Sequence, residues 1–276
     1  MILPTDFSFS QASLQDYVDC RRRFQLRYLL RLAWPAIEAE PALEHERLLR
    51  SGAALHRIIQ QHILNVPEAR LTHSVIDEDL KRWWHNYLQN PPSDLPTIRF
   101  PEIILSAPIT DFRLVAKYDL LAIEPGERAV IVDWKTSLRR PSHRWMTDRI
   151  QTKVYRYLLV RAGTHLNDGD QLLPSLVEMI YWFANYPEEP ERLQYNEAKF
   201  NADDAFLTAL IEEIQDLGED EFVLTDQEFK CLYCRYRSLC LRGVGAGEID
   251  KMTEELETRE DLGNYLDFDQ ISEVEF

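Results

Sequence analysis

The sequence predicts an α/β fold in which a mixed central sheet is flanked by helices, and three observations lead to this class. Residues 98–136 are rich in β-branched and aromatic side chains and contain a Pro125-Gly126 turn, which favours consecutive strands. The segment at about 146–162 has the apolar spacing of a helix. A strand-like segment follows at about 176–184, which gives the strand and helix alternation of an α/β chain.

Each element has a local reason, taken in chain order. Ser10 can cap a helix that runs to about residue 32. Helices at about 43–64 and 74–89 follow, and Pro91-Pro92 then breaks the chain. The remaining expected elements are strands at 98–109, 112–123 and 128–136, the helix at 146–162, the strand at 176–184 and a helix at 203–217.

Length and composition set the domain organisation. A chain of 276 residues with 45% hydrophobic content can bury one substantial core, and no apolar run reaches the length of a membrane span. We therefore expect one domain over residues 1–245 and an acidic tail over 246–276. Within the domain we expect a core at about 98–217, a helical insertion at about 40–97, and a peripheral region made of 8–32 and 225–242.

Asp119, Asp133 and Lys135 lie at the ends of neighbouring predicted strands. Because the Pro-Gly turn folds these strands together, the two carboxylates and the ammonium converge at one sheet edge. Ionised groups so deep in apolar strands are costly unless they are paired or bind a metal. The residues alone leave two interpretations open: a buried Asp–Lys ion pair, or a divalent-metal site of the kind that hydrolyses phosphodiesters.

Further polar residues can reach the same place. Gln151 and Tyr155 are four residues apart and so share one face of their helix. His56, in Gly-Ala-Ala-Leu-His, can approach from another helical stretch. Each has a structural alternative: a polar helix surface for the first two, and a satisfied core histidine for His56. Glu102 lies in a neighbouring strand, where it could support the site or form a salt bridge.

Taken in order, Gly-x-x-x-His, Asp, Asp-x-Lys and Gln-x-x-x-Tyr resemble the RecB-type branch of the PD-(D/E)xK nucleases. That branch includes the AddB nuclease domain and small CRISPR adaptation exonucleases. The resemblance implies a restriction-endonuclease-like core and a DNA exonuclease acting on single-stranded ends, in repair, recombination or CRISPR adaptation. It implies a Mg²⁺ or Mn²⁺ site with His56, Asp119, Asp133 and the Trp134 carbonyl as ligands. Lys135 would orient water or stabilise transition-state charge, and Gln151 and Tyr155 would contact the substrate backbone or position Lys135.

The four cysteines extend the resemblance. Cys20 is remote from the local triplet Cys231-x-x-Cys234-x5-Cys240. This division resembles the iron-sulfur staple of the same branch, in which a [4Fe-4S] cluster ties the first helix to the region after the core. A zinc ion held by all four thiolates is the alternative, followed by unligated thiols. The N-terminus has neither a basic n-region nor an apolar h-region, so we expect reduced cysteines and a cytoplasmic protein.

The net charge of −16 is the main objection to a nucleic-acid enzyme, because phosphate binding usually leaves a basic footprint. The charge is uneven: residues 246–276 carry eleven acids and two bases, whereas residues 135–161 carry eight bases and one acid. Local fields steer a strand more than the total does. From the second segment we expect strand contacts by Arg139, Arg140, Arg144, Lys153 and Arg156. The alternative is a solvated helix face paired with acids elsewhere.

Partner choice is open in the sequence. The acidic tail fits a solvating segment, a docking peptide for a protein such as a helicase or a CRISPR integrase, or an intramolecular mimic of nucleic acid. The insertion before residue 98 is a second place for such contacts. The sequence contains no Gly-x-x-x-x-Gly-Lys-(Ser/Thr) motif, so unwinding would come from another polypeptide. The competing functional class is a catalytically inactive binding module that keeps the nuclease fold.

Overall fold

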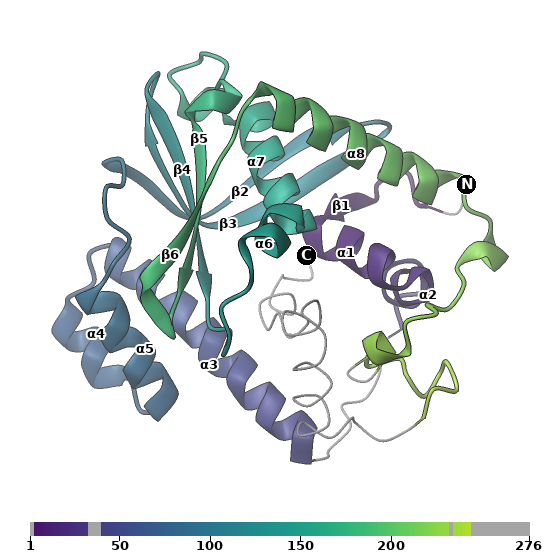
Figure 1. The fold of residues 1–276 in the computed structure, drawn as a ribbon, viewed down its shortest axis with the longest axis horizontal. Helices are drawn as coiled ribbons and strands as arrows, with labels where there is room; N and C mark the ends of the chain where they lie inside the picture. Colours follow the sequence, from purple (N-terminus) through teal and green to yellow (C-terminus); the bar gives the residue numbers. More distant parts are fainter. Residues whose placement is uncertain (1–2, 33–39, 232–233, 244–276) are drawn as a thin grey trace.

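A mixed sheet of six strands forms the centre of the protein, in a computed structural model that describes residues 3–32, 40–231 and 234–243 (Figure 1). The strands are β1 (Ser8–Ser10), β2 (Ile98–Ile109), β3 (Phe112–Glu124), β4 (Arg128–Lys135), β5 (Val177–Phe183) and β6 (Tyr186–Gln194). Their order is β1-β3-β4-β5-β6, with β2 paired to β3. The pairs β1–β3 and β4–β5 are parallel, and the other pairs are antiparallel. The expected α/β class is confirmed.

Helices cover both faces of the sheet. The helices α1 (Gln11–Asp19), α7 (Ile150–Ala162) and α8 (Glu197–Asp216) pack into one hydrophobic core, which we call the α7 layer. The helices α3 (Glu40–Ile63), α4 (Glu68–Ser74) and α5 (Glu78–Gln89) lie at the other core, the α3 layer (Figure 1). Shorter elements complete the described chain: α2 (Arg21–Phe24), η1 (Gln25–Leu29), α6 (His143–Asp148), η2 (Gly163–Leu166), η3 (Pro174–Leu176), η4 (Glu219–Glu221) and η5 (Glu228–Cys231).

Strand β4 determines which layer each of its side chains enters. Ala129 and Ile131 belong to the α7-layer core, whereas Val132 and Trp134 belong to the α3-layer core. Since successive side chains of a strand point to opposite faces, the remaining odd-numbered residues, 133 and 135, face the α7 layer. The two charged residues of the Asp-x-Lys motif therefore point toward α7, while the tryptophan between them points toward α3.

Strands β3 and β4 stop pairing just before the Asp133-x-Lys135 motif. Their antiparallel pairing ends at Leu120 and Val132, whereas β4 continues beside β5 as far as Lys135. Beyond the last pair, a side chain replaces the backbone as the acceptor: Asp119 Oδ2 accepts the N–H of Trp134 at 2.9 Å. The fork between the two strands is thus closed by a carboxylate, because a buried N–H requires an acceptor.

Glu102 lies opposite Asp119 in the β2–β3 pair, between the registered pairs Pro101–Leu120 and Ile103–Tyr118. Its backbone is left-handed, with φ of 57°, which costs a non-glycine residue about 1–2 kcal/mol. Alternation breaks at the same level of β3, because Tyr118 belongs to the α7-layer core and Leu120 to the α3-layer core. The irregularity turns both carboxylates away from regular strand positions and toward one place.

The sequence predicted the meander well and the first helix poorly. The three expected strands between 98 and 136 match β2, β3 and β4 to within a residue. The single helix expected from Ser10 to about Leu32 is wrong, because Cys20 has an extended backbone (φ −163°, ψ 109°) that separates α1 from α2. The expected helix at about 74–89 is confirmed as α5 over residues 78–89, but it begins later, since α4 ends at Ser74 and Asp77 caps α5 by accepting the N–H of Leu80.

Two of the strands were not expected from the sequence. Strand β6 contains Pro187 and Pro190 among several glutamates, and these residues are tolerated because β6 lies at the sheet edge. Strand β1 is only three residues long, so it carries no periodic signal.

The acidic tail at 246–276 lies outside the described residues. Within the described part of the chain, no helix is both long and apolar enough to cross a membrane.

Candidate metal-dependent active site

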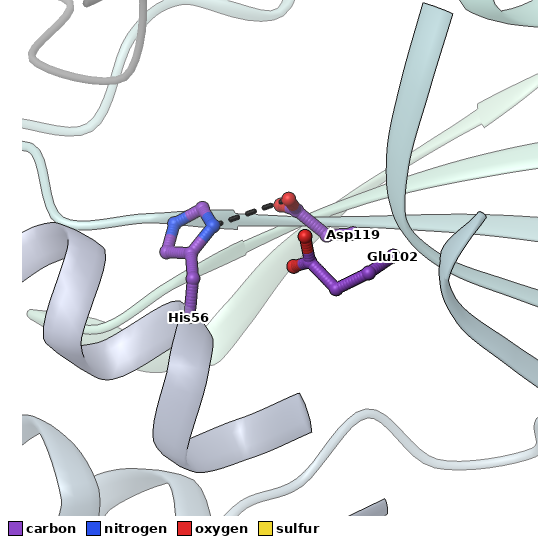
Figure 2. Close-up of side chains that lie close together, drawn as sticks. All are labelled: His56, Glu102 and Asp119. Atoms are coloured by element: carbon purple, nitrogen blue, oxygen red, sulfur yellow. Dashed lines mark hydrogen bonds and ion pairs between the residues drawn. The ribbon is translucent and has the colours of Figure 1, made fainter. Parts of the chain in front are cut away.

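His56, Glu102 and Asp119 converge from α3, β2 and β3 (Figure 2). One possible ligand atom from each lies within 4.8 Å of the others, and His56 Nδ1 is 3.1 Å from Asp119 Oδ1. Figure 2 shows the imidazole directed at the two carboxylates. Two carboxylates and a ring nitrogen are suited to Mg²⁺ or Mn²⁺, and the nitrogen makes Mn²⁺ more competitive. The donor set therefore fits a divalent cation.

Gly52 explains how α3 approaches the sheet closely enough for His56 to reach Asp119. A Cβ at this position would lie 3.2 Å from Oγ1 of Thr136, the residue that follows β4. Gly52 and His56 are one helical turn apart, so they share a face. The neighbouring Leu55 is fully buried in the α3-layer core and anchors the same helix. The Gly-x-x-x-His spacing thus combines a close packing contact with a candidate metal donor.

Asp119 is held in its ionised form. Burial raises the pKa of its carboxyl, but His56, the N–H of Trp134 and the charge of Lys135 outweigh that effect and lower the pKa below its ordinary value. Opposite charge and hydrogen bonds to a carboxylate both favour its charged form. The residue is therefore a carboxylate at neutral pH, as a metal ligand must be.

Asp133, Lys135 and Gln151 form a second polar cluster on the α7 side. Lys135 Nζ lies 2.9 Å from Asp133 Oδ2 and donates to Gln151 Oε1 at 3.1 Å. Gln151 Nε2 in turn donates to Asp133 Oδ1 at 2.8 Å. The three residues are only 3%, 3% and 5% exposed, so their polar groups have one another as partners. The amide fixes the lysine and the carboxylate relative to one another.

The two clusters join through the backbone of Trp134, and this arrangement differs from the expected ligand set. His56 and Asp119 belong to the group of close ligand atoms, but Asp133 does not, and Glu102 stands in its place. Asp133 is instead engaged by Lys135 and Gln151. Glu102 joins this group because it lies opposite Asp119. That position can be recognised only once the β2–β3 register is known. Ligation by Asp133 and by the Trp134 carbonyl stays a prediction.

Two other predicted site residues have packing roles. The ring of Tyr155 is 4.8 Å from that of Tyr118 between centroids, and its backbone carbonyl accepts the Tyr118 hydroxyl at 2.9 Å. Trp134 packs edge-on against Trp182, 5.8 Å away. Substrate contact by Tyr155 stays a prediction.

Glu102 also forms an ion pair with Lys117, as the salt-bridge alternative anticipated.

The basic segment is partly paired with acids, and one of its predicted strand contacts is corrected. Arg156 is only 2% exposed, stacks on Tyr195 at 4.5 Å and lies 3.5 Å from Asp203, so it is an interior residue. Lys153 also approaches Asp203, at 3.8 Å. The other predicted contacts lie at the surface that follows β4: Arg139 is exposed, Arg140 pairs with Glu191, and Arg144 is 92% exposed beside Asp148.

The cysteine-bearing segments are brought together. Burial raises the pKa of the thiols of Cys231, Cys234 and Cys240, and the nearby charge of Cys20 adds to this rise. All four cysteines are half-buried and none forms a disulfide. Polar contacts support the same junction: Lys230 Nζ lies 3.1 Å from Asp19 Oδ1, and the Tyr236 hydroxyl donates to the carbonyl of Leu32 at 3.0 Å.

The fold and the site together define a nuclease. The PD-(D/E)XK nuclease superfamily matches residues 8–241, and the chain belongs to this superfamily. The match includes both polar clusters as well as the four cysteines.

Solved structures that resemble the chain do so at low sequence identity. A provisionally assigned exonuclease from Eubacterium rectale has a TM-score of 0.50 and 10% identity, over 87% of this chain and 89% of that one. The crystal structure of SSO0001 has a TM-score of 0.38 and 14% identity, over 86% and 87% of the two chains. No curated protein matches the chain at a significant level.

Proposed function

We propose that the protein is a Mg²⁺- or Mn²⁺-dependent deoxyribonuclease that removes nucleotides from single-stranded ends. The observation that carries this proposal is the meeting of His56, Glu102 and Asp119 beside the Lys135–Asp133 pair. Members of the superfamily generally use divalent metals, and the donor set fits such an ion. The provisional assignment of the Eubacterium rectale protein as an exonuclease supports the exonuclease part of the proposal.

The chemistry divides between the two clusters. Bound at the first cluster, a divalent cation would neutralise charge on a phosphoryl oxygen and activate water. Lys135 supplies a second positive charge for the oxygens on which negative charge develops. Gln151 and Asp133 keep its ammonium in place, and a charge held in advance stabilises the transition state without reorganisation. Asp133 and the Trp134 carbonyl would be further ligands of the cation.

We assign the four cysteines to a [4Fe-4S] cluster, with zinc as the second choice. Cys20 and the three later thiols come from opposite ends of the superfamily match, so a shared group would join α1 and α2 to the segment after α8. The break between α1 and α2 supports this, because it places the thiol-bearing residue at a corner rather than inside a helix. Soft thiolate ligands select iron-sulfur clusters or zinc.

The substrate and the partners complete the proposal. Three exposed or part-exposed arginines follow β4: Arg139, Arg140 and Arg144. They can guide a nucleic-acid strand toward the site at the end of β4. We assign single-stranded DNA as the substrate, in repair, recombination or CRISPR adaptation inside the cell. A helicase or an integrase would dock through the acidic tail or through the α3–α5 insertion.

The test begins with protein purified without oxygen, in which iron and sulfide are measured. Single strands labelled at either end and a covalently closed single-stranded circle are then incubated with Mg²⁺, Mn²⁺ or EDTA. Wild type should shorten the linear strands in a metal-dependent way and leave the circle intact. Lys135→Ala should abolish cleavage, whereas Lys81→Ala, on the exposed surface of α5, should not change it.

Three results would contradict parts of this proposal. Retention of strands without products in any metal would favour an inactive binding module. Cleavage of the circle would replace the exonuclease assignment with an endonuclease. A colourless, zinc-loaded protein would remove the iron-sulfur cluster but leave the nuclease assignment standing.

A further inference from the structure

Lys117 pairs with a carboxylate of the candidate metal site. Its Nζ forms an ion pair with Oε2 of Glu102, the β2 residue that converges with His56 and Asp119. In the β2–β3 ladder Lys117 is registered with Ile104, two residues from Glu102, so the two charged side chains are diagonal neighbours. Long side chains can bridge such a diagonal. A cation that belongs to the chain is therefore held at the place where the donor set fits a divalent ion.

Lys117 reaches this place from the side of the sheet opposite to Lys135. Its neighbours on β3, Ala116 and Tyr118, belong to the α7-layer core, so Lys117 points to the α3 side. Lys135 faces the α7 layer, where it donates to Gln151. The Lys135 side chain is 4% exposed, whereas the Lys117 side chain is 34% exposed. A part-exposed ammonium can exchange an ion pair for water at little cost, so the Lys117 contact is the one that can open.

The two carboxylates of the site each have a basic partner from the chain. Asp119 faces His56 Nδ1 at 3.1 Å, and Glu102 pairs with Lys117. These partners reduce the repulsion between two carboxylates that lie close together, so the site can keep its shape without a metal. A divalent cation needs the same carboxylates, and its charge repels a nearby ammonium. Lys117 and a bound cation therefore compete for Glu102.

We propose that Lys117 is a tethered cation that occupies Glu102 in the metal-free site and is displaced by the divalent ion, so that it sets the metal concentration at which the site fills. The inference rests on the proposed metal-dependent function and concerns the regulation of the same site. The displacement exchanges ion-pair partners and breaks no covalent bond. In the opposite arrangement Lys117 would keep one oxygen of Glu102 while the cation takes the other, and the lysine would then support metal binding.

Calorimetric titration with Mn²⁺ distinguishes the two arrangements, on protein purified without oxygen and freed of divalent metal. Lys117→Met keeps the length of the side chain and removes its charge, so it should bind Mn²⁺ about 3- to 10-fold more tightly than wild type. Lys117→Arg keeps the charge and should bind no more tightly than wild type. The matched control is Arg113→Gln. Arg113 is an exposed cation on the same strand that donates to Ser106 Oγ at 2.6 Å, and its loss should leave Mn²⁺ binding unchanged.

A double variant shows whether the effect passes through Glu102. In a Glu102→Gln background, Lys117→Met should give a much smaller gain than in wild type, because the contested carboxylate is absent. A gain of the same size in both backgrounds would overturn the inference. Equal or weaker Mn²⁺ binding in Lys117→Met than in wild type would also overturn it.

Two further measurements keep these outcomes separate from those of the proposed function. If wild type binds Mn²⁺ but cleaves no strand, the proposed function fails, yet the titrations still decide about Lys117. Absence of Mn²⁺ binding in both wild type and Lys117→Met overturns the candidate site and the inference together. Melting curves are recorded without metal for each variant. If Lys117→Met is unfolded, the polar variant Lys117→Gln is titrated in its place, and the same gain is required of it.

Discussion

Asp119 accepts the backbone N–H of Trp134 at 2.9 Å at the level where β3 and β4 stop pairing. The Asp119 carboxylate therefore has two roles. Its Oδ2 accepts the backbone N–H where the two strands diverge, and its Oδ1 faces His56. The candidate metal site and the second polar cluster, of Asp133, Lys135 and Gln151, are joined through this contact. The following predictions separate its structural role from its chemical role.

Replacing Asp119 with Asn should abolish metal-dependent cleavage and preserve the fold. The amide oxygen can still accept the Trp134 N–H, so the fork stays closed, but the negative charge that a divalent cation needs is lost. We expect cleavage to fall by at least about 100-fold, since a charge stabilising the transition state is removed. Thermal melting and cleavage measured together check this, and Asp119→Ala should in addition lower the melting temperature.

Metal binding should stabilise the protein, and more strongly the more tightly the metal binds. A ligand at 100 times its dissociation constant adds about 2.7 kcal/mol to the free energy of unfolding, so Mn²⁺ should raise the melting temperature by about 5 °C or more. His56→Ala should reduce this rise because it loses one donor. An equal rise in His56→Ala and wild type would show that the cation binds elsewhere.

Gly52→Ala should destabilise the protein despite the better helix propensity of alanine. The substitution gains about 0.5–1 kcal/mol of propensity, but overpacking against Thr136 costs about 1–3 kcal/mol. Because α3 must move outward, His56 should retreat from Asp119 and cleavage should decrease. Thr136→Ala removes both side-chain atoms that the new methyl would meet, so the double variant should recover stability and activity. Absence of recovery in denaturant unfolding would argue against this contact.

Glu102→Gly should bind Mn²⁺ more weakly and yet be no less stable than wild type. Glycine relieves about 1–2 kcal/mol of left-handed strain. The part-exposed ion pair with Lys117 that is lost is worth at most about 1 kcal/mol. Glu102→Gln is the matched control, since it keeps the strained backbone and loses only the charge. Chemical denaturation and calorimetric metal titration distinguish the two, and a large loss of stability in Glu102→Gly would contradict the strain argument.

The junction of the N-terminal and C-terminal segments should survive removal of the proposed cluster. Lys230 pairs with Asp19, and Gln25 donates to the carbonyl of Glu219 at 2.9 Å, without help from any thiolate. Cys20→Ser should therefore lose iron and yet resist limited proteolysis between residues 3 and 32. Adding Lys230→Met to that variant should expose the segment, because the buried partner Asp19 loses one of its cations. Rapid cleavage of Cys20→Ser alone would show that the polar contacts are insufficient.

The strands of the meander were predictable because their signals are local. Phe112–Glu124 and Arg128–Lys135 contain the β-branched and aromatic residues of buried strands, and Gly126 has the positive φ of 76° that their turn requires. The helix break at Cys20 was not predictable. The neighbouring sequence favours a helix throughout, and long-range contacts such as the one between the Arg22 N–H and the carbonyl of Val223 come from a segment two hundred residues away.

The sequence by itself determined the order of the motifs, the class of fold and the residues capable of acid, base or metal chemistry, because residue type and spacing carry that information. Only the tertiary structure decided how those residues are grouped. It placed Glu102 with His56 and Asp119, engaged Asp133 with Lys135 and Gln151, and put Arg156 in the interior. The physical reason is that these groupings depend on strand register, on one left-handed residue and on the approach of a glycine-bearing helix, and none of these is encoded within a short window of sequence.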